Sequence, residues 1–252
     1  MESGNRPITV ITGGSRGIGA ATAIRLARAG HHLAVAYRDD AAAAKRLSAA
    51  VTAQGVRCVT VRTDVAHEED VDQLFTIATQ QLGTVTGLVN NAGLTAHIGD
   101  LIDTPVHIIR RVIEVNLVGV VLCARRAAQL MSVRRAGGGG AIVNVSSVAA
   151  TLGSAHEYVH YAAAKAAVDA LTVGLAKELA GDKIRVNAVA PGIVHTRIHA
   201  DAGDPSRADR LASRIPVGRA GDPDEIAAAI AWLLSPEASY VTGAVLRAGG
   251  GL

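Results

Sequence analysis

Two side chains with complementary chemistry, Tyr161 and Lys165, stand at positions i and i+4 in an Ala-rich stretch of helical period, residues 158–179. A cation within a few ångströms of a phenol favours the phenolate, so it lowers the tyrosine pKa from about 10 toward neutral pH. A phenol with such a pKa is an efficient general acid or base. The same pair on a solvated surface is an ordinary contact, so the spacing predicts chemistry only where the fold brings the pair to a ligand.

A glycine-rich turn, T-G-G-S-R-G-I-G at residues 12–19, follows an apolar run and precedes a helical pattern. Its glycines permit a tight turn that brings backbone N–H groups to a pyrophosphate at a helix N-terminus. The same residues contain G-x-S-x-G around Ser15, the pattern of a hydrolase nucleophile elbow. An elbow needs an upstream oxyanion loop and earlier strands, and only twelve residues precede Gly13. The context favours dinucleotide binding over a hydrolase or a merely structural turn.

A literal H-E-x-x-H zinc motif runs from His156 to His160, with Glu178 downstream, and His195 and His199 form a second H-x-x-x-H pair. Zinc catalysis requires both histidines on one face of a formed helix in an open cleft. The first motif falls at or before a predicted helix start, and the second falls in a predicted loop. We therefore expect solvated or hydrogen-bonding histidines and no metal site.

These residues must be positioned by short runs of Val and Ile that alternate with Ala-rich helical stretches along the chain. The pattern predicts the α/β class, as a single doubly wound Rossmann-type domain over residues 1–252 with a seven-stranded parallel sheet flanked by helices. The predicted strands are residues 8–12, 33–37, 57–61, 87–89, 141–145, 185–189 and 244–246. The predicted helices are residues 17–29, 41–54, 68–82, 106–135, 158–179 and 223–234.

Composition excludes several classes of partner. Hydrophobic residues make up 49% and aromatic residues 2% of the chain, and the 25 Lys+Arg and 22 Asp+Glu are dispersed, so no nucleic-acid partner is expected. No run reaches the roughly 18 apolar residues of a membrane span, so no membrane partner is expected either. Cys58 and Cys123 lie in apolar stretches, and the first seven residues hold Glu2 and Asn5 but no apolar run. These features predict a cytoplasmic protein without a signal peptide.

The ordered motifs resemble those of the short-chain dehydrogenase/reductase family over residues 8–250, including its 3-oxoacyl-carrier-protein reductase-like and glucose dehydrogenase-like members. Nearly every motif follows the carboxyl end of a predicted strand, which is where ligands bind in open α/β sheets. After the glycine turn, the motifs are Asp64-Val65, N-N-A-G at residues 90–93, Asn116, N-V-S-S at residues 144–147, Tyr161 with Lys165, and Pro191-Gly192.

The resemblance implies an NAD(P)-dependent enzyme that interconverts carbonyl and alcohol groups by hydride transfer. It implies that Tyr161 exchanges the proton, that Lys165 lowers the Tyr161 pKa and holds the nicotinamide ribose, and that Ser147 holds the substrate oxygen. Asn116 is similar to the family asparagine that supports a water chain leading to the lysine. The structural alternatives are a helix cap for Ser147 and a buried amide for Asn116. The interval of 14 residues between Ser147 and Tyr161 predicts one extra loop residue within residues 153–157.

For the cofactor, the resemblance favours NADP(H) over NAD(H), because Tyr37 stands where NAD-preferring relatives keep an acidic residue. Arg38 and Arg16 offer two guanidinium groups to a 2'-phosphate, whereas Asp39 offers a carboxylate to a ribose hydroxyl. The cofactor-binding residues that the resemblance implies are Gly13, Ser15, Arg16, Gly17, Ile18, Gly19, Tyr37, Arg38, Asp64, Val65, Asn91, Ala92, Gly93, Tyr161, Lys165, Pro191, Gly192, Val194 and Thr196.

The expected partners are a small carbonyl or alcohol substrate and further copies of the chain, as a homotetramer or dimer. Residues 195–214 occupy the place of the family's substrate lid and are polar. A 3-oxoacyl-carrier-protein reductase is one alternative, and it needs a basic docking patch. Another alternative is a dinucleotide-sensing module without catalysis. The candidate basic residues are Arg125, Arg126, Arg134 and Arg135.

Overall fold

The computed structural model describes residues 6–252. Residues 1–5 of the predicted domain lie outside it, and they make up most of the segment on which the prediction about a signal peptide rests. Seven strands form one sheet in the order β3-β2-β1-β4-β5-β6-β7, and all the pairs are parallel. The predicted doubly wound sheet is confirmed. The strands are β1 Ile8–Ile11, β2 His32–Tyr37, β3 Cys58–Arg62, β4 Gly87–Asn90, β5 Gly140–Val145, β6 Ile184–Pro191 and β7 Val245–Ala248.

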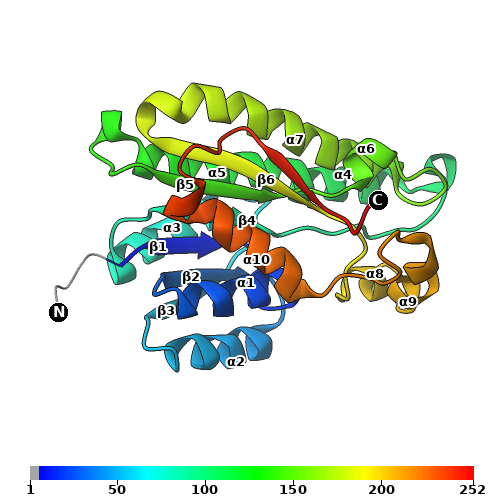
Figure 1. Cartoon of the computed structure of the whole chain (residues 1–252), viewed down its shortest axis with the longest axis horizontal. Coiled ribbons are helices and arrows are strands. Elements are labelled where there is room, and N and C mark those ends of the chain that lie inside the picture. Colours follow the sequence, from blue (N-terminus) through cyan, green and yellow to red (C-terminus); the bar gives the residue numbers. More distant parts are fainter. Residues whose placement is uncertain (1–5) are drawn as a thin grey trace.

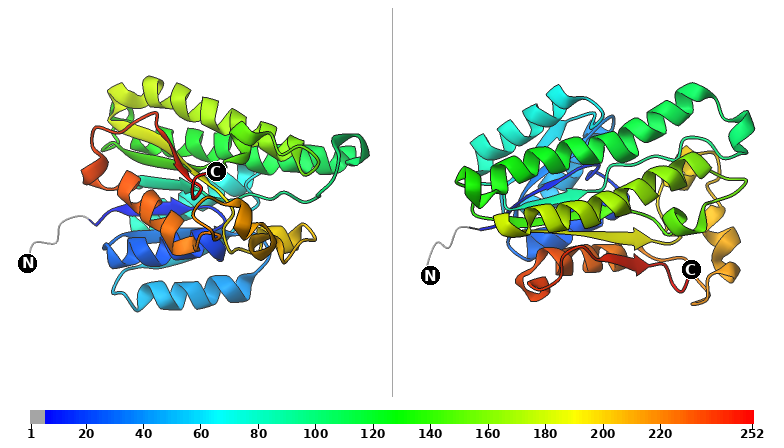
Figure 2. Two further views of the ribbon diagram at one scale, coloured as in Figure 1. Left: turned by 45° about the vertical axis from the view of Figure 1, so that its right-hand side comes forward. Right: turned by 90° about the horizontal axis from the view of Figure 1, so that it is seen from above.

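Helices cover both faces of the sheet (Figures 1 and 2). One face is covered by α1, α2 and α10, and the other by α3, α5 and α7. Short helices α8 and α9 lie beyond the carboxyl ends of the strands. The helices are α1 Gly17–Arg28, α2 Ala41–Thr52, α3 Glu68–Leu82, α4 Val106–Ile113, α5 Gly119–Met131, α6 Ala149–Leu152, α7 Val159–Leu179, α8 Ile198–Asp201, α9 Arg207–Leu211 and α10 Pro223–Leu234.

Two hydrophobic clusters hold the layers together, because successive side chains of a strand point to opposite faces. On β1, Val10 packs with Leu74 and Phe75 of α3, whereas Ile11 packs with Leu26 of α1. All five side chains are at most 1% exposed. A sheet buried on both faces has apolar strands with little alternation, which is what the sequence shows.

The predicted helix over residues 106–135 is wrong as a single regular element. The structure has α4, a π-helical turn at Glu114–Val118, α5 and a 3-10 turn at Val133–Arg135. The Asn116 side chain lies in the π turn, where its Nδ2 donates to the Val112 carbonyl at 2.9 Å. In a regular α-helix that carbonyl accepts the backbone N–H of residue 116. The asparagine side chain therefore takes over a backbone bond where the helix widens.

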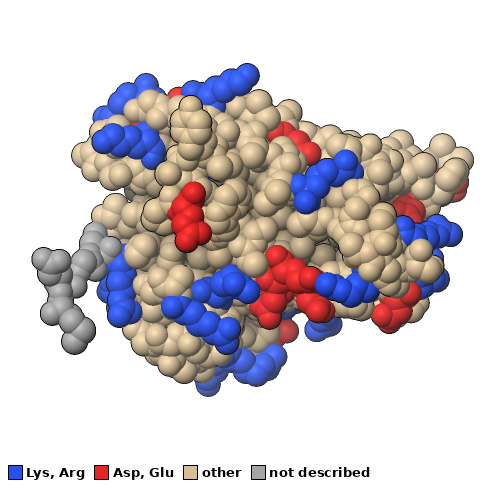
Figure 3. All heavy atoms as spheres, viewed as in Figure 1, with Lys and Arg blue, Asp and Glu red and all other residues tan. Residues whose placement is uncertain are grey.

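Charges of both signs are interspersed on the face shown in Figure 3. The side chain of Arg219 donates to both carboxylate oxygens of Glu225, at 2.7 and 2.8 Å. Within residues 6–252 no helix combines the length and the hydropathy that crossing a membrane requires.

Candidate active site

A cleft of about 860 Å³ opens at the carboxyl ends of the strands, between the sheet and the segment that carries α8 and α9. Its volume lies within the range of small-molecule sites. Of the predicted site residues, Gly19 and Asn116 lie outside the cleft wall. The predicted residues that line it are Gly13, Ser15, Arg16, Gly17, Ile18, Tyr37, Arg38, Asp64, Val65, Asn91, Ala92, Gly93, Ser147, Tyr161, Lys165, Pro191, Gly192, Val194 and Thr196.

The glycine turn is too closely packed for larger residues. Gly13 has a φ of +59°, and a Cβ there would lie 2.8 Å from the Cα of Ala92. A Cβ on Gly19 would lie 2.6 Å from Nδ2 of Asn91, so Gly19 serves packing under the turn rather than the cleft wall. Asn91 Nδ2 in turn donates to the carbonyls of Thr12 and Gly13 at 3.0 and 2.9 Å. The asparagine therefore fixes the turn from behind.

Helix α1 begins beside this turn at Gly17 without a side-chain cap. Its first-turn N–H groups therefore lack the usual capping oxygen, and the positive end of the helix dipole faces the cleft. This arrangement is a ready-made site for a phosphate group.

Tyr161 and Lys165 lie on the inward face of α7, where their side chains are 8% and 3% exposed. The Lys165 Nζ is 5.6 Å from the centre of the Tyr161 ring and donates to the Val145 carbonyl at 2.7 Å. That carbonyl is at the end of β5. The surface-pair alternative is thereby excluded, because the fold buries both side chains against the cleft.

Burial determines the protonation of this pair. It raises the pKa of Tyr161 above its ordinary value, and a side-chain hydrogen bond with Ser147 offsets part of that rise. Burial also lowers the pKa of Lys165 to about 8, against the attraction of Asp169. The role of Lys165 in lowering the Tyr161 pKa stays a prediction, because desolvation of the phenolate sets the direction of the shift in this structure. The phenol is therefore protonated at neutral pH, which is the form that donates a proton.

The two serines after β5 have different surroundings. The Ser147 Oγ faces Tyr161 across the cleft and also accepts the N–H of Ala149 at 3.1 Å, so the capping alternative is present as well. The Ser146 Oγ is buried and donates to the Lys165 carbonyl at 3.4 Å. Of the two serines, Ser147 is thus the one beside the phenol.

Asn116 is fully buried in the π turn, behind the cleft wall. Its Nδ2 donates to the Leu94 carbonyl at 2.7 Å, and its Oδ1 accepts the Leu94 N–H at 3.3 Å. A Cβ on the neighbouring Gly93 would lie 2.8 Å from Asn116 Oδ1 and 3.7 Å from Lys165 Nζ. Asn116 therefore holds the backbone that passes beside the lysine.

Three charged side chains of the cleft rim are already paired. Arg16 of the glycine turn donates to Asp201 of α8 at 2.8 Å, and Arg38 donates to Asp39 at 2.6 Å. Asp64 accepts Arg111 of α4 at 2.5 Å and the Ala66 N–H at 3.1 Å. The Asp64 carboxylate thus has protein donors on both oxygens, which the sequence-based role at the adenine did not anticipate.

Comparison with known proteins places this geometry in a family. A family sequence model described as enoyl-(acyl carrier protein) reductase matches residues 13–252. Uncharacterized oxidoreductase YgfF of Escherichia coli (strain K12) is 45% identical over 244 residues, covering 97% of this chain and 99% of that protein. Cis-4-hydroxycyclohexanecarboxylate dehydrogenase of Sinomonas cyclohexanicum is 44% identical over 244 residues, covering 97% and 95%. A short-chain type dehydrogenase/reductase from Mycobacterium marinum superposes with a TM-score of 0.90 at 32% identity, covering 97% of this chain and 94% of that structure. The chain belongs to the short-chain dehydrogenase/reductase family.

As a short-chain dehydrogenase/reductase, the chain is an oxidoreductase of alcohol and carbonyl groups, in a family that uses NAD(P). The two histidines of the H-E-x-x-H sequence are not arranged as a zinc site. The His156 side chain is 84% exposed and contacts Asp100, whereas His160 is buried, so the two rings do not share a site. Within residues 6–252 no cluster of three or more His, Cys, Asp or Glu side chains is arranged to hold a metal ion.

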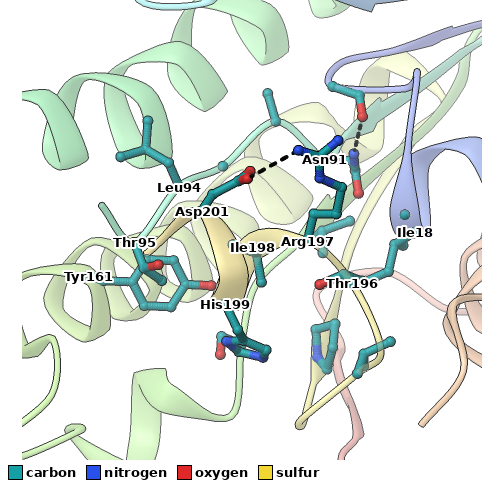
Figure 4. Close-up of a pocket in the computed structure, with 18 of the residues that line it drawn as sticks. Ile18, Asn91, Leu94, Thr95, Tyr161, Thr196, Arg197, Ile198, His199 and Asp201 are labelled. Atoms are coloured by element: carbon teal, nitrogen blue, oxygen red, sulfur yellow. Dashed lines mark hydrogen bonds and ion pairs between the residues drawn. The ribbon is translucent and has the colours of Figure 1, made fainter. Parts of the chain in front are cut away.

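Sequence reasoning missed one wall of this dehydrogenase's cleft. Tyr158 precedes α7 and stacks edge-on against Tyr161, with ring centres 5.4 Å apart. Arg207 of α9 and Glu157 join it, and His199 of α8 lines the same cleft (Figure 4). The i, i+3 spacing of Tyr158 and Tyr161 was the available signal, but Tyr158 itself lies inside the H-E-x-x-H sequence of residues 156–160.

Proposed function

We propose that this chain reduces the carbonyl group of a small molecule to an alcohol, reversibly, with NADPH as the hydride donor and with Ser147, Tyr161, Lys165 and Asn116 as its site. The observation that carries the proposal is the burial of Tyr161 and Lys165 one helical turn apart, at the carboxyl edge of the sheet, with the phenol protonated. A protonated phenol beside a cation suits proton donation to a carbonyl oxygen.

The residues of the cleft fit a dinucleotide. The absence of a Cβ at Gly13 and the uncapped first turn of α1 leave backbone N–H groups for a pyrophosphate. Gly93 lets the backbone pass close beside Lys165, since a Cβ there would lie 3.7 Å from its Nζ. Gly192 lets the backbone pass close to the end of β7, since a Cβ there would lie 2.7 Å from the Cα of Gly249. When bound, the nicotinamide supplies the hydride.

The side chains then have separate roles in the proposed reaction. Ser147 donates a hydrogen bond to the substrate oxygen, and Tyr161 transfers its phenolic proton to that oxygen as negative charge develops there. The Lys165 ammonium stabilises the resulting phenolate. Asn116 holds the Leu94 backbone beside Lys165, where a water chain can return the proton to the tyrosine.

For the cofactor, the proposal prefers NADPH to NADH. Arg16, Tyr37 and Arg38 all line the cleft, and the two arginine side chains are each 51% exposed. Exposed ion pairs contribute about 0–1 kcal/mol, so a 2'-phosphate can replace Asp201 and Asp39 as their partner. The test compares kcat/KM for the two cofactors in the wild type and in Arg38→Ala. A wild-type preference for NADH would refute this part of the proposal.

The substrate we propose is a free small molecule rather than an acyl chain on a carrier protein. Three of the four candidate docking arginines are already paired with acids: Arg125 contacts Glu68, and Arg126 contacts Asp72. Arg134 contacts Asp182. An acidic carrier would have to displace these partners. The named activity of the Sinomonas relative supports hydroxylated rings of about six carbons as first compounds to test.

We also propose a homotetramer in the cytoplasm. The outward faces of α5 and α7 present small apolar side chains, among them Val121 and Val173 at 38% and 39% exposure. Leu246 on the edge strand β7 is 37% exposed. Light scattering after size-exclusion chromatography tests the assembly, and the mass of a single chain would refute it.

The activity is tested by the loss of NADPH absorbance with a panel of ketones, 3-oxoacyl thioesters, quinones and sugars. Tyr161→Phe keeps the ring and removes the proton, so turnover falls by about 100-fold or more while cofactor binding persists. Full activity in that variant would overturn the assignment of Tyr161. Cofactor binding without turnover of any carbonyl would favour the sensing module.

A further inference from the structure

The wall of the cleft opposite the glycine turn carries a buried arginine. Arg207 of α9 is 5% exposed although it belongs to a short surface helix. Its Nη2 donates to Glu157 Oε2 at 2.7 Å and to the Tyr158 hydroxyl oxygen at 3.1 Å. The guanidinium also lies over the Tyr158 ring, 5.3 Å from its centre. This wall, composed of Arg207, Glu157 and Tyr158, joins the segment that carries α8 and α9 to the start of α7.

The wall retains hydrogen-bond donors that the protein does not use. Within residues 6–252 the Nε–H of Arg207 is buried and has no hydrogen-bond partner. The Tyr158 hydroxyl oxygen accepts from Arg207, so its own hydrogen is directed elsewhere. Both residues line the cleft. A buried donor without an acceptor is unfavourable, so a ligand that brings an oxygen to this wall relieves that cost.

The charges of the wall select among oxygen ligands. Glu157 already balances Arg207, and a second carboxylate would approach Glu157 as well as the arginine. His199 lines the same part of the cleft, and burial together with the nearby Arg207 lowers its pKa to about 4, so it is neutral at pH 7. Donors beside an acceptor, with no net charge, complement a hydroxyl group, which both donates and accepts.

The distance from the reacting centre sets where this hydroxyl lies in the substrate. The ring of Tyr158 separates Arg207 from Tyr161, with the Tyr158 centre 5.3 Å from the guanidinium carbon and 5.4 Å from the Tyr161 centre. We propose that the substrate carries a second, neutral hydroxyl several bonds from its carbonyl carbon, and that Arg207, Tyr158 and Glu157 bind this hydroxyl. This inference rests on the proposed carbonyl reduction and adds the class of substrate.

The test uses three ketones on one ring: 4-hydroxycyclohexanone, cyclohexanone and 4-oxocyclohexanecarboxylate. For the wild type we expect kcat/KM for the hydroxyketone to exceed that for cyclohexanone by about 10- to 100-fold, with most of the difference in KM. Equal values for these two ketones would overturn the proposal. A preference for the carboxylate would overturn the choice of a neutral hydroxyl.

Variants connect the preference to the wall. Arg207→Lys keeps a cation beside Glu157 but removes the Nε–H, and Tyr158→Phe keeps the ring but removes the hydroxyl. Each is expected to reduce the ratio of hydroxyketone to cyclohexanone by about 10-fold. Arg210→Ala, on the exposed side of α9 with Asp204 as its partner, is the matched control and should leave the ratio unchanged. An unchanged ratio in both wall variants would overturn the assignment.

A binding measurement separates this inference from the proposed reaction. Calorimetry on the protein with NADP⁺ compares trans-cyclohexane-1,4-diol with cyclohexanol and requires no turnover. Tighter binding of the diol in the wild type, lost in Arg207→Lys, supports the hydroxyl site even if no ketone is reduced. Turnover of ketones with equal affinity for the two alcohols would overturn the hydroxyl site and leave the proposed reduction intact.

Discussion

Replacing Asn116 with alanine tests whether the π turn holds the backbone beside Lys165. The buried side chain makes three hydrogen bonds to backbone groups, two with Leu94 and one with Val112. An unpaired buried polar group costs about 1–3 kcal/mol, and a water molecule admitted to the vacated space recovers part of that cost. We expect the free energy of unfolding to fall by about 3 kcal/mol, which lowers Tm by about 6–12 °C for a chain of this size.

The activity of Asn116→Ala distinguishes positioning from stability. The released segment at Gly93 and Leu94 lies against Lys165, so kcat at 25 °C should fall by about 10-fold or more in protein that is still folded. The matched control is Asn144→Ala, because Asn144 is equally buried and bonds to Asn90 and Thr172 at 2.9 Å, away from the cleft. The control should lose comparable stability and retain kcat. An unchanged Tm in Asn116→Ala, or an equal loss of kcat in the control, would refute the reasoning.

Three further outcomes follow from the structure. Gly13→Ala places a Cβ 2.8 Å from the Cα of Ala92 at a φ of +59°. The affinity for NADPH, measured by calorimetry, should therefore fall by about 10-fold, and Tm should drop. Wild-type affinity in this variant would contradict the argument that the turn has no room for a Cβ. Arg219 and the Asp222 N–H lower the pKa of Glu225 to about 2, so this carboxylate stabilises the fold above its ordinary pKa of 4.5, and that contribution is lost as the pH falls toward 2. The Tm difference between wild type and Glu225→Gln should therefore shrink from pH 7 to pH 3. A constant difference would contradict the stabilising role of the Glu225 carboxylate. Burial lowers the pKa of Lys165 from 10.5 to about 8, so the unfolded state binds more protons than the folded state between pH 8 and pH 10.5. The stability of the wild type relative to Lys165→Met, measured by denaturant titration, should therefore rise over this pH range.

Most of the fold could be predicted because its signals are local. The strands are apolar almost throughout, so the seven strands and most of the longer helices could be recognised from their own residues, whereas the short helices α6, α8 and α9 were not predicted. The break after Ile113 could not be predicted, because it accompanies a hydrogen bond between Asn116 and Leu94, which are 22 residues apart in the chain. A side chain that replaces a helical backbone bond leaves no periodic signal.

The candidate site was predictable to the extent that its residues follow strand ends. The residues around Gly13, Asn91, Ser147 and Lys165 meet at one cleft because parallel strands end at one edge. Arg207 was not predictable as a site residue, because an arginine in a polar segment has no feature that marks it as buried. Its place depends on how α9 folds back over Tyr158.

The amino-acid sequence by itself determined the class of fold, the edge of the sheet where a ligand binds and the pair Tyr161 and Lys165, since these depend on period, spacing and strand order. Only the tertiary structure decided the protonation of this pair and the carboxylates with which Arg16 and Arg38 form ion pairs. It also decided which polar groups remain unpaired in the cleft. The physical reason is that desolvation and hydrogen bonding depend on neighbours brought together from distant parts of the chain. The periodic spacing of apolar residues, in contrast, is a property of each segment alone.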